Sequence, residues 1–241
     1  MEFKNTEVCG FKHALRGMRN PKDSWDKSDS EYWLPNKFME ENVSGENIEW
    51  TPYHIGKNDM KLAQTLIKAG NEHRKFMRQI FVSVDITAPL YWWKEFDTYK
   101  VGTVANSTST MHKLATTPIT LDCFEIDDYD RNLSLTDNPK DDDGLDNIST
   151  FEEDIIYVLE NIRQKYLETK DKRYWKELVR WLPESWLQKR TITMNYENVR
   201  NMYFQRRNHK LTEWSESFIK WVESLPYAEE LIMYDGSSEN P

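Results

Sequence analysis

The sequence lacks the residues on which common metal and thiol sites depend. It has only two cysteines in 241 residues, Cys9 and Cys123, which are too few for a cysteine-based zinc site. No secretion signal is recognisable, so two reduced thiols are expected rather than a disulfide. The five histidines are scattered, and none pairs with a second histidine or a cysteine at ligand spacing. We therefore expect no metal site.

Glycine-rich phosphate-binding loops are also missing. The eight glycines form neither a P-loop nor a Rossmann motif, so the backbone groups that bind phosphate in those folds are absent. No Gly-x-Ser-x-Gly sequence marks a hydrolase nucleophile. A nucleotide site in this chain must therefore be made of side chains.

Net positive charge and long apolar runs are absent as well. The formal net charge is -9 at pH 7, which disfavours duplex nucleic acid, although a local group of arginines can still bind one phosphate. No stretch approaches the roughly 18 to 20 apolar residues that cross a bilayer, and the first residues lack an apolar signal-peptide core. We expect a cytoplasmic protein that binds neither duplex nucleic acid nor a membrane.

Aromatic residues are abundant and indicate a folded core. They make up 13% of the chain and include ten tryptophans, too many for a disordered protein. The length suits one large domain, so residues 1–241 are expected to form a single domain. Its expected parts are an aromatic-rich N-terminal segment (1–58), a core (59–225) with an acidic insertion at about 125–148, and a C-terminal tail (226–241).

The secondary-structure pattern favours helices around a small sheet. Residues 80–87 alternate between apolar and other side chains, which predicts a half-buried strand. Helices are expected at about 11–18, 60–67, 89–99, 149–166, 175–182, 195–205 and after 212. Ser149 and Glu152 have the spacing of a capping box at the start of one of them. The expected class is α+β.

Two groups of polar side chains remain as candidate binding residues. One is a nearly uncharged hydroxyl run that contains Thr103, Ser107, Thr108, Ser109 and Thr110. The other is basic and amide-rich, and contains Arg190, Arg200, Arg206, Arg207 and Lys210 among Asn195, Asn198, Asn201 and Asn208. Asparagines and arginines along a helix suit a polar ligand that carries phosphates and amide-like edges. A solvated helix face beside an ordinary Ser/Thr loop explains the same pattern.

Residues 66–114 resemble the core of the flavin-dependent thymidylate synthases. That family has a helix ending in Lys-x-Gly-x-Glu, a strand, an Ala-Pro helix and the signature R-H-R-x-x-S-x-N-E-x-S-x-R-Y. When this sequence is aligned with the family pattern without a gap, "KAGNE" matches Lys-x-Gly-x-Glu and "AP" matches the Ala-Pro pair. The signature keeps a positive charge at Lys100 and hydroxyls at Thr103 and Thr108. Its histidine, glutamate and closing arginine are replaced by Tyr99, Asn106 and Thr110.

The C-terminal half is more similar to the family. Arg180 precedes a Leu-Pro pair, as in the family, and a helix of form N-x-R-x-x-x-N-x-x-x-x-R follows. The positions in register are Asn195, Asn201 and Arg206, whereas Glu197 stands in place of the helix arginine. A histidine expected on the flavin falls at Lys210. The resemblance covers about residues 60–225.

The resemblance implies the thymidylate synthase complementing protein-like fold, with a small antiparallel sheet and a majority of helices. It implies a homotetramer with sites at subunit interfaces, each binding FAD and a pyrimidine nucleotide. The implied reaction is the reductive methylation of dUMP to dTMP with methylenetetrahydrofolate and NADPH. Two alternatives stay open: a homologue that acts on another pyrimidine nucleotide, and a non-catalytic nucleotide-binding protein of the same fold.

Matched positions assign roles to individual residues. Arg206, facing the pyrimidine ring, is the expected catalytic residue. The residues expected on the nucleotide are Arg180, Ser107, Thr108, Ser109 and Arg206. Those expected on the flavin are Tyr99, Lys100, Asn106, Asn195, Asn201 and Lys210. Arg16 and Arg19 are candidates to replace the missing signature arginines.

Overall fold

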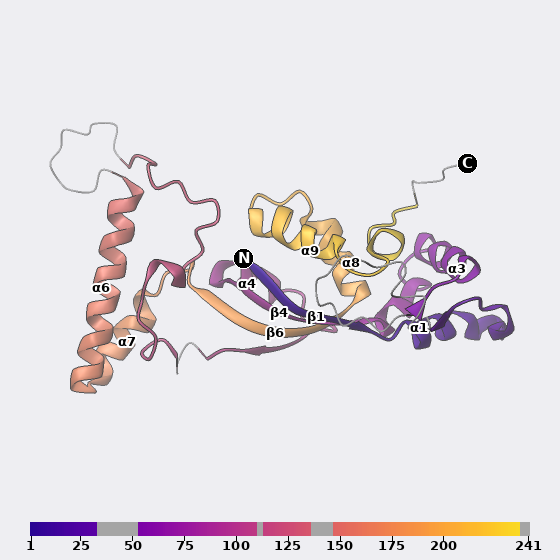
Figure 1. Cartoon of the computed structure of the whole chain (residues 1–241), viewed down its shortest axis with the longest axis horizontal. Helices are drawn as coiled ribbons and strands as arrows, with labels where there is room; N and C mark the ends of the chain where they lie inside the picture. The colour runs from indigo at the N-terminus through magenta and orange to yellow at the C-terminus, as the bar shows by residue number, and fades with distance from the viewer. Residues whose placement is uncertain (33–52, 110–112, 136–146, 237–241) are drawn as a thin grey trace. The chain divides into compact units, whose positions relative to one another are not determined.

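A computed structural model describes residues 1–32, 53–109, 113–135 and 147–236. The protein is α+β, as the sequence predicts, and about half of it is helical (Figure 1). The larger sheet has the strand order β1-β4-β6-β5, and a second sheet pairs β2 with β3. The strands are β1 (Glu2–Cys9), β2 (Glu31–Tyr32), β3 (Tyr53–His54), β4 (Phe81–Pro89), β5 (Val104–Ser107) and β6 (Leu187–Asn195).

The two central strands of the larger sheet, β4 and β6, run antiparallel. The hydroxyls of Ser83 and Thr193 lie 2.9 Å apart, and the hydroxyl of Thr191 donates to Asp85 at 2.6 Å. Rising numbers in one strand therefore meet falling numbers in the other. The predicted small antiparallel sheet is confirmed.

The alternating pattern of β4 is also confirmed. Val82, Val84 and Ile86 are at most 1% exposed, as is Ile80 just before the strand, whereas Phe81 is 44% exposed. Burying each of these aliphatic side chains contributes about 1.5 to 3 kcal/mol. One face of the strand thus belongs to the core.

The helices follow most of the predicted ranges. They are α1 (Phe11–Arg19), α3 (Lys57–Lys68), α4 (Leu90–Phe96), α6 (Ile148–Thr169), α7 (Lys172–Trp181), α8 (Tyr196–Arg206) and α9 (Ile219–Glu223). Short 3-10 helices are η1 (Asn20–Lys22), η2 (Trp25–Lys27), η3 (Arg74–Gln79) and η4 (Leu121–Cys123), and π-helical turns are η5 (Glu213–Phe218) and η6 (Ala228–Ile232).

Two predictions at helix ends are wrong. The helix expected at 89–99 is shorter, because Pro89 still belongs to β4 and the helix ends at Phe96. The expected capping box at Ser149 does not form, because the helix already begins at Ile148. Its N-cap is Asn147, whose side-chain oxygen accepts from the backbone N–H of Thr150 at 3.2 Å.

The chain divides into two compact units. The first comprises residues 1, 87–95 and 107–189, and the second comprises 2–86, 96–106 and 190–241. Strands β4 and β6 each contribute to both units, so the single domain stays a prediction. Among the described residues no helix is long and apolar enough to cross a bilayer.

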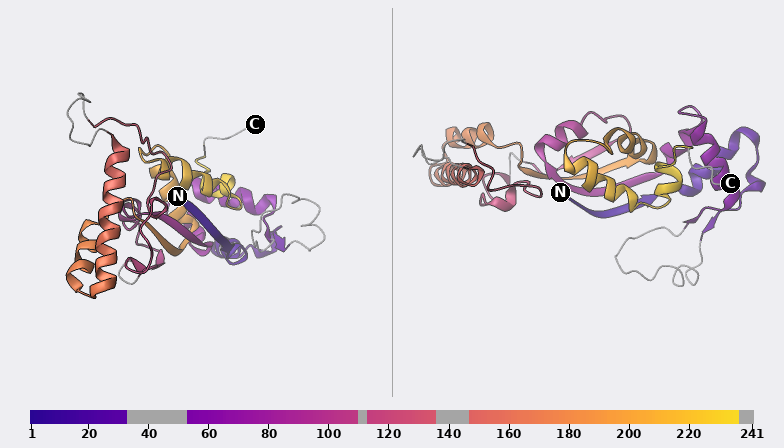
Figure 2. Two further views of the ribbon diagram at one scale, coloured as in Figure 1. Left: turned by 60° about the vertical axis from the view of Figure 1, so that its left-hand side comes forward. Right: turned by 90° about the horizontal axis from the view of Figure 1, so that it is seen from above.

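The first unit is built around α6 and α7, which pack side by side (Figure 2). Its buried cluster consists of Leu114, Ile119, Phe124, Leu159, Leu178 and Trp186. An ion pair ties α6 to the segment before it: Arg163 donates to Glu160 and also to the carbonyl of Ala115. Glu160 in turn accepts from the backbone N–H of Ile119 at 2.9 Å.

The second unit contains the helix with the asparagine and arginine stripe. Here α8 and α9 lie on one face of the strands (Figure 1). The core is largely aromatic, with Trp214, Phe218 and Tyr196 fully buried. Helix α8 also packs against η3, η6 and α9, which leaves Asn198, Asn201 and Gln205 among its residues with exposed surface.

Candidate functional site

A loop after α4 packs closely against the first turn of α8. Gly102 has a left-handed backbone with φ 78°, and a Cβ there would lie 2.8 Å from Oδ1 of Asn198 and 2.9 Å from Nδ2 of Asn195. The Nδ2 atom of Asn198 donates to the carbonyl of Val101 at 2.5 Å. Only glycine combines this conformation with so close an approach.

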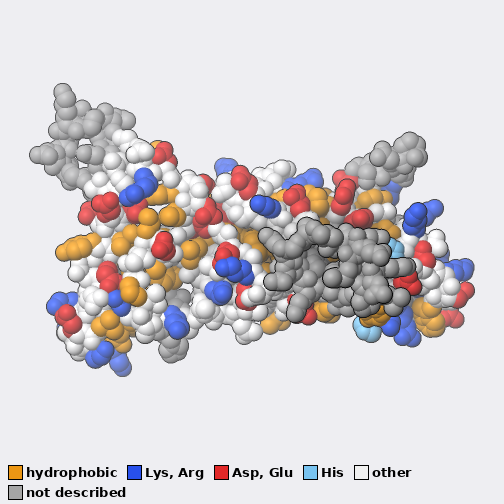
Figure 3. Space-filling view, viewed as in Figure 1, with side chains coloured by type: hydrophobic (Ala, Val, Ile, Leu, Met, Phe, Trp, Pro, Cys, Tyr) orange, Lys and Arg blue, Asp and Glu red, His pale blue; other side chains and the backbone are white. Residues whose placement is uncertain are grey.

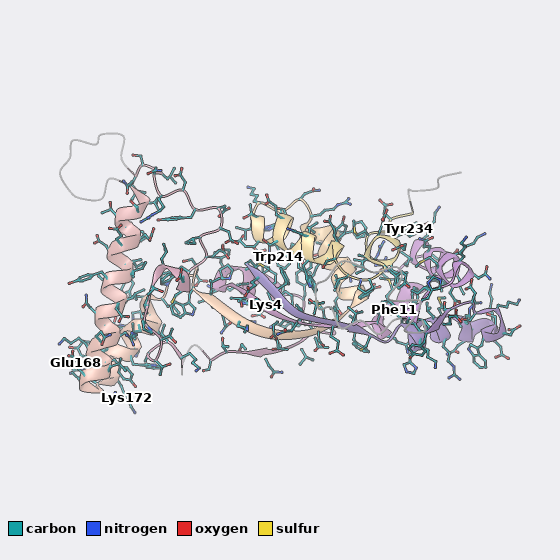
Figure 4. The ribbon with its side chains drawn as sticks, viewed as in Figure 1. Lys4, Phe11, Glu168, Lys172, Trp214 and Tyr234 are labelled. Carbon is teal, nitrogen blue, oxygen red and sulfur yellow. The ribbon has the colours of Figure 1, made fainter. Side chains whose placement is uncertain are left out.

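Arg206 at the end of α8 packs against two aromatic rings that also contact each other. Its Nε donates to the hydroxyl of Tyr99 at 2.8 Å, and that hydroxyl donates to Gln205 at 3.0 Å. Its guanidinium carbon lies 4.9 Å from the ring centre of Trp214 and 5.5 Å from that of Tyr99. Cation–π contacts and a hydrogen bond therefore fix its orientation. Trp214, labelled in Figure 4, comes from η5.

Asn195 is the N-cap of α8. Its side-chain oxygen accepts from the backbone N–H of Asn198 at 3.0 Å, and the residue is only 7% exposed. The Oδ1 atom of Asn198 is buried and has no hydrogen-bond partner among the residues that the structure describes. An unsatisfied buried acceptor costs about 1 to 3 kcal/mol, and this one lies against Gly102.

The buried acid of α8, Glu197, is neutralised by Arg74 of η3. The Nε atom of Arg74 lies 3.0 and 3.1 Å from the two carboxylate oxygens, and Nη2 lies 3.5 Å from Oδ1 of Asn201. The pKa of Arg200 is lowered to about 10. The larger cause is the burial of Arg200, and the second is the nearby positive charge of Arg74. Arg200 remains a cation and donates to the carbonyls of Ile232 and Tyr234.

A polar strip on α8 lies between Arg74 and Arg206. Asn198, Asn201 and Gln205 follow at spacings of three and four residues, which puts them on one face of the helix. Asn198 and Asn201 are partly exposed and Gln205 is exposed. Arg206 contacts Tyr99 beside one edge of the strip, and Arg74 contacts Asn201 at the other. The strip therefore combines amide groups with two fixed guanidinium groups.

The remaining residues expected on the flavin lie in the same unit as this strip. Lys100, Asn106 and Lys210 are exposed and belong to the same unit. The structure thus brings together Tyr99, Asn195, Asn201 and Arg206 of the predicted site. Arg16 lies over the ring of Trp25 and Arg19 is buried on Asp59, so their expected role in the site stays a prediction.

The residues expected on the nucleotide phosphate lie in the other unit. Ser107, Thr108 and Ser109 run beside the start of β6, where Thr108 donates from its backbone N–H and its hydroxyl to the carbonyl of Lys189. Arg180 is exposed on α7 and pairs with Glu177 one turn earlier. Thr110, the last residue of the hydroxyl run, lies outside the described residues.

The sequence analysis names neither Arg74 nor the contact of Trp214 with Arg206. The signal for Arg74 is indirect: Glu197 lies on a buried face of α8, and a buried acid needs a cation from another element. Trp214 was expected only as a core residue. In the described part of the chain, no group of three or more metal-ligating side chains occurs.

Comparison with solved structures identifies the fold. The chain matches the flavin-dependent thymidylate synthase ThyX from Helicobacter pylori, crystallised with FAD and dUMP, at a TM-score of 0.62 and 16% identity. The match covers 96% of this chain and 98% of that one. A second structure of the same enzyme, also with FAD and dUMP, matches at a TM-score of 0.59 and 16% identity, over 96% of this chain and 97% of that one. No protein-family model and no curated protein sequence matches. The chain thus has the fold of these enzymes.

The strip on α8 offers both a hydrogen-bond acceptor and hydrogen-bond donors. The buried Oδ1 of Asn198 supplies an acceptor without a partner in the described residues. The guanidinium groups of Arg206 and Arg74 supply donors at the two edges of the strip.

Proposed function

We propose that the protein is a flavin-dependent thymidylate synthase-like enzyme that methylates dUMP to dTMP, with FAD as cofactor and methylenetetrahydrofolate and NADPH as co-substrates. The observation that carries the proposal is the polar strip of α8 with its fixed Arg206, in a fold matched over 96% of the chain. When bound, FAD supplies the hydride chemistry. The residues of the chain bind, orient and polarise the substrate.

Arg206 is the proposed catalytic residue. The hydroxyl of Tyr99 and the ring of Trp214 fix its guanidinium before any ligand arrives. A preorganised cation beside a pyrimidine carbonyl stabilises negative charge that develops on the ring during attack at carbon. This role needs no cysteine nucleophile, which agrees with two cysteines that lie outside the α8 strip.

Asn195, Asn198 and Asn201 are the proposed ring-binding residues. Asn195 holds the first turn of α8 in place through its cap, and Asn198 offers the buried acceptor. Lys100, Asn106 and Lys210 are proposed to meet the cofactor from the exposed side. For the nucleotide phosphate we propose Arg180 with Ser107, Thr108 and Ser109, as the resemblance implies.

A nucleotide-binding role without dTMP synthesis is the second candidate. One observation favours it: Tyr99, which replaces the signature histidine, uses its hydroxyl within the protein, on Arg206 and Gln205. Such a site retains the ring-binding strip but has lost most of the positive charge of the family signature. This second candidate includes both a homologue that acts on another pyrimidine nucleotide and a non-catalytic nucleotide-binding protein.

We further propose a cytoplasmic homotetramer. Helices α6 and α7 expose large hydrophobic side chains, including Tyr157 at 70% and Trp181 at 63%, and hydrophobic side chains gather over this region in Figure 3. Exposed apolar patches of this kind mark protein interfaces. Analytical ultracentrifugation measures the mass directly; a monomer at all concentrations contradicts this part of the proposal.

The cofactor is tested by the visible absorption of the purified protein. Protein prepared without added ligand, and then with FAD added and the excess removed, is expected to show stoichiometric flavin absorption. Mass spectrometry of the small molecules released by denaturation identifies the flavin. A folded protein that stays colourless after FAD is added contradicts the enzyme and supports the second candidate.

A further inference from the structure

The acid at position 197 is the feature of α8 that departs most from the family pattern. The pattern has an arginine there, between the two asparagines expected on the flavin. Here Glu197 is 6% exposed and carries the opposite charge. A buried carboxylate is stable only when it is paired, so the substitution requires a cation from elsewhere.

Arg74 is that cation, and it comes from a different part of the chain. It is the first residue of η3 and lies 123 positions before Glu197. Its Nε bonds both carboxylate oxygens, and its Nη2 approaches Oδ1 of Asn201 at 3.5 Å. The guanidinium therefore lies beside the same turn of α8 on which the family carries its arginine.

Arg74 keeps donors for a ligand after these contacts. An arginine has five N–H donors, and the contacts to Glu197 and Asn201 use two of them. Its side chain is 15% exposed and that of Glu197 is 8% exposed. The side chain of the acid is thus more deeply buried than that of Arg74, which keeps some exposed surface beside Asn201.

We propose that Arg74 is a cofactor-binding residue that supplies, from η3, the guanidinium that the family places on α8, and that Glu197 is the residue that positions it. The ligand group is a carbonyl oxygen of the flavin ring, next to Asn201. This inference rests on the proposed function, since it assigns one contact of the proposed cofactor.

The test separates ligand binding from the structural effect of the ion pair. In the double variant Arg74→Met with Glu197→Met, both charges are replaced by side chains of similar length, a change that often leaves stability intact. We expect its melting temperature to stay close to that of the parent and its FAD affinity to fall about tenfold or more. Affinity is measured by quenching of flavin fluorescence on titration with protein, and dUMP affinity in the same variant is expected to be unchanged.

Two further variants keep the test decisive if the double methionine protein does not fold. Arg74→Lys retains the charge opposite Glu197 but loses the planar fork, and is expected to fold and to bind FAD more weakly. The exchange Arg74→Glu with Glu197→Arg returns an arginine to α8 and is expected to recover most of the lost affinity.

The outcomes distinguish this inference from the proposed function. FAD binding by the parent, with a loss in the methionine or lysine variant and recovery in the exchange, supports both. Equal FAD binding by the parent and all three variants overturns the role of Arg74 alone. A parent that binds no FAD overturns the proposed cofactor, and the role of Arg74 falls with it.

Discussion

Arg206 and Tyr99 lie 107 residues apart in the chain and are joined by a hydrogen bond of 2.8 Å from the guanidinium Nε to the phenol oxygen. The bond connects the end of α8 to the loop that follows α4. Because Trp214 packs on the same guanidinium, the arginine is oriented by contacts from two separate elements. A residue fixed in this way is suited to act on a bound ring.

Arg206→Ala is expected to weaken dUMP binding by about tenfold to a hundredfold, since it removes a charged hydrogen-bond donor from the site. Quenching of tryptophan fluorescence on titration with dUMP measures the effect. Arg207→Ala is the matched control, because Arg207 is exposed and stacks on Phe204 instead. Equal affinities in the two variants contradict the assignment of Arg206.

Tyr99→Phe keeps the ring but removes the hydroxyl that orients Arg206. We expect dTMP formation to slow by about fivefold to tenfold, with the unfolding free energy changed by about 1 kcal/mol or less. Tyr32→Phe is the control, because that side chain is 51% exposed on β2. An unchanged rate in Tyr99→Phe shows that the orientation of Arg206 does not depend on this bond.

Gly102→Ala tests the close packing of the loop on α8. The new methyl group meets Asn195 and Asn198, and both of those side chains are held by hydrogen bonds. Gly70→Ala is a matched control, since Gly70 also has positive φ but has nothing within 4 Å of the added atom. We expect Gly102→Ala to lower the unfolding free energy by about 1 to 3 kcal/mol more than the control does. If chemical denaturation shows the same loss of unfolding free energy in both variants, the packing of Gly102 against α8 does not contribute to stability.

Glu160 predicts a pH dependence of stability in the first unit. The hydrogen bonds from Arg163, the largest cause, lower the pKa of Glu160 from 4.5 to about 2. A lowered pKa stabilises the fold above the unfolded value, and this contribution is lost as the pH falls from about 4.5 towards 2. Glu160→Gln is therefore expected to be less stable than the parent at pH 7, with the difference shrinking over that window.

Urea denaturation at a series of pH values measures this difference. Glu168→Gln is the control, because Glu168 forms an exposed pair with Lys165 on the same helix. A Glu160→Gln deficit that is the same at pH 7 and pH 2 would show that the ion pair does not stabilise the fold.

Local patterns predicted the elements that carry the site, but not the contacts between them. The alternation of β4 and the spacing of α8 are visible in the sequence because they depend on neighbouring residues. Of the larger sheet, strands β1, β5 and β6 were missed, and Asn5 interrupts the regular backbone of β1 with φ 53°. The pair Arg74–Glu197 was also missed, because partners 123 residues apart leave no local pattern.

The match to the family signature singled out residues but not their contacts. The binding roles of Asn195 and Arg206 stay predictions, and the structure shows that Asn195 caps α8 and that Arg206 is held by Tyr99 and Trp214. Those partners come from the fold around the motif, and the motif itself does not specify them.

The most direct test of the proposed function is dTMP formation from dUMP by the purified protein with FAD, NADPH and methylenetetrahydrofolate, followed by chromatography of the nucleotides. We expect dTMP that requires all three additions and is lost in Arg206→Ala. A folded protein that binds dUMP but forms no dTMP would contradict the proposed enzyme and leave a nucleotide-binding protein of the same fold.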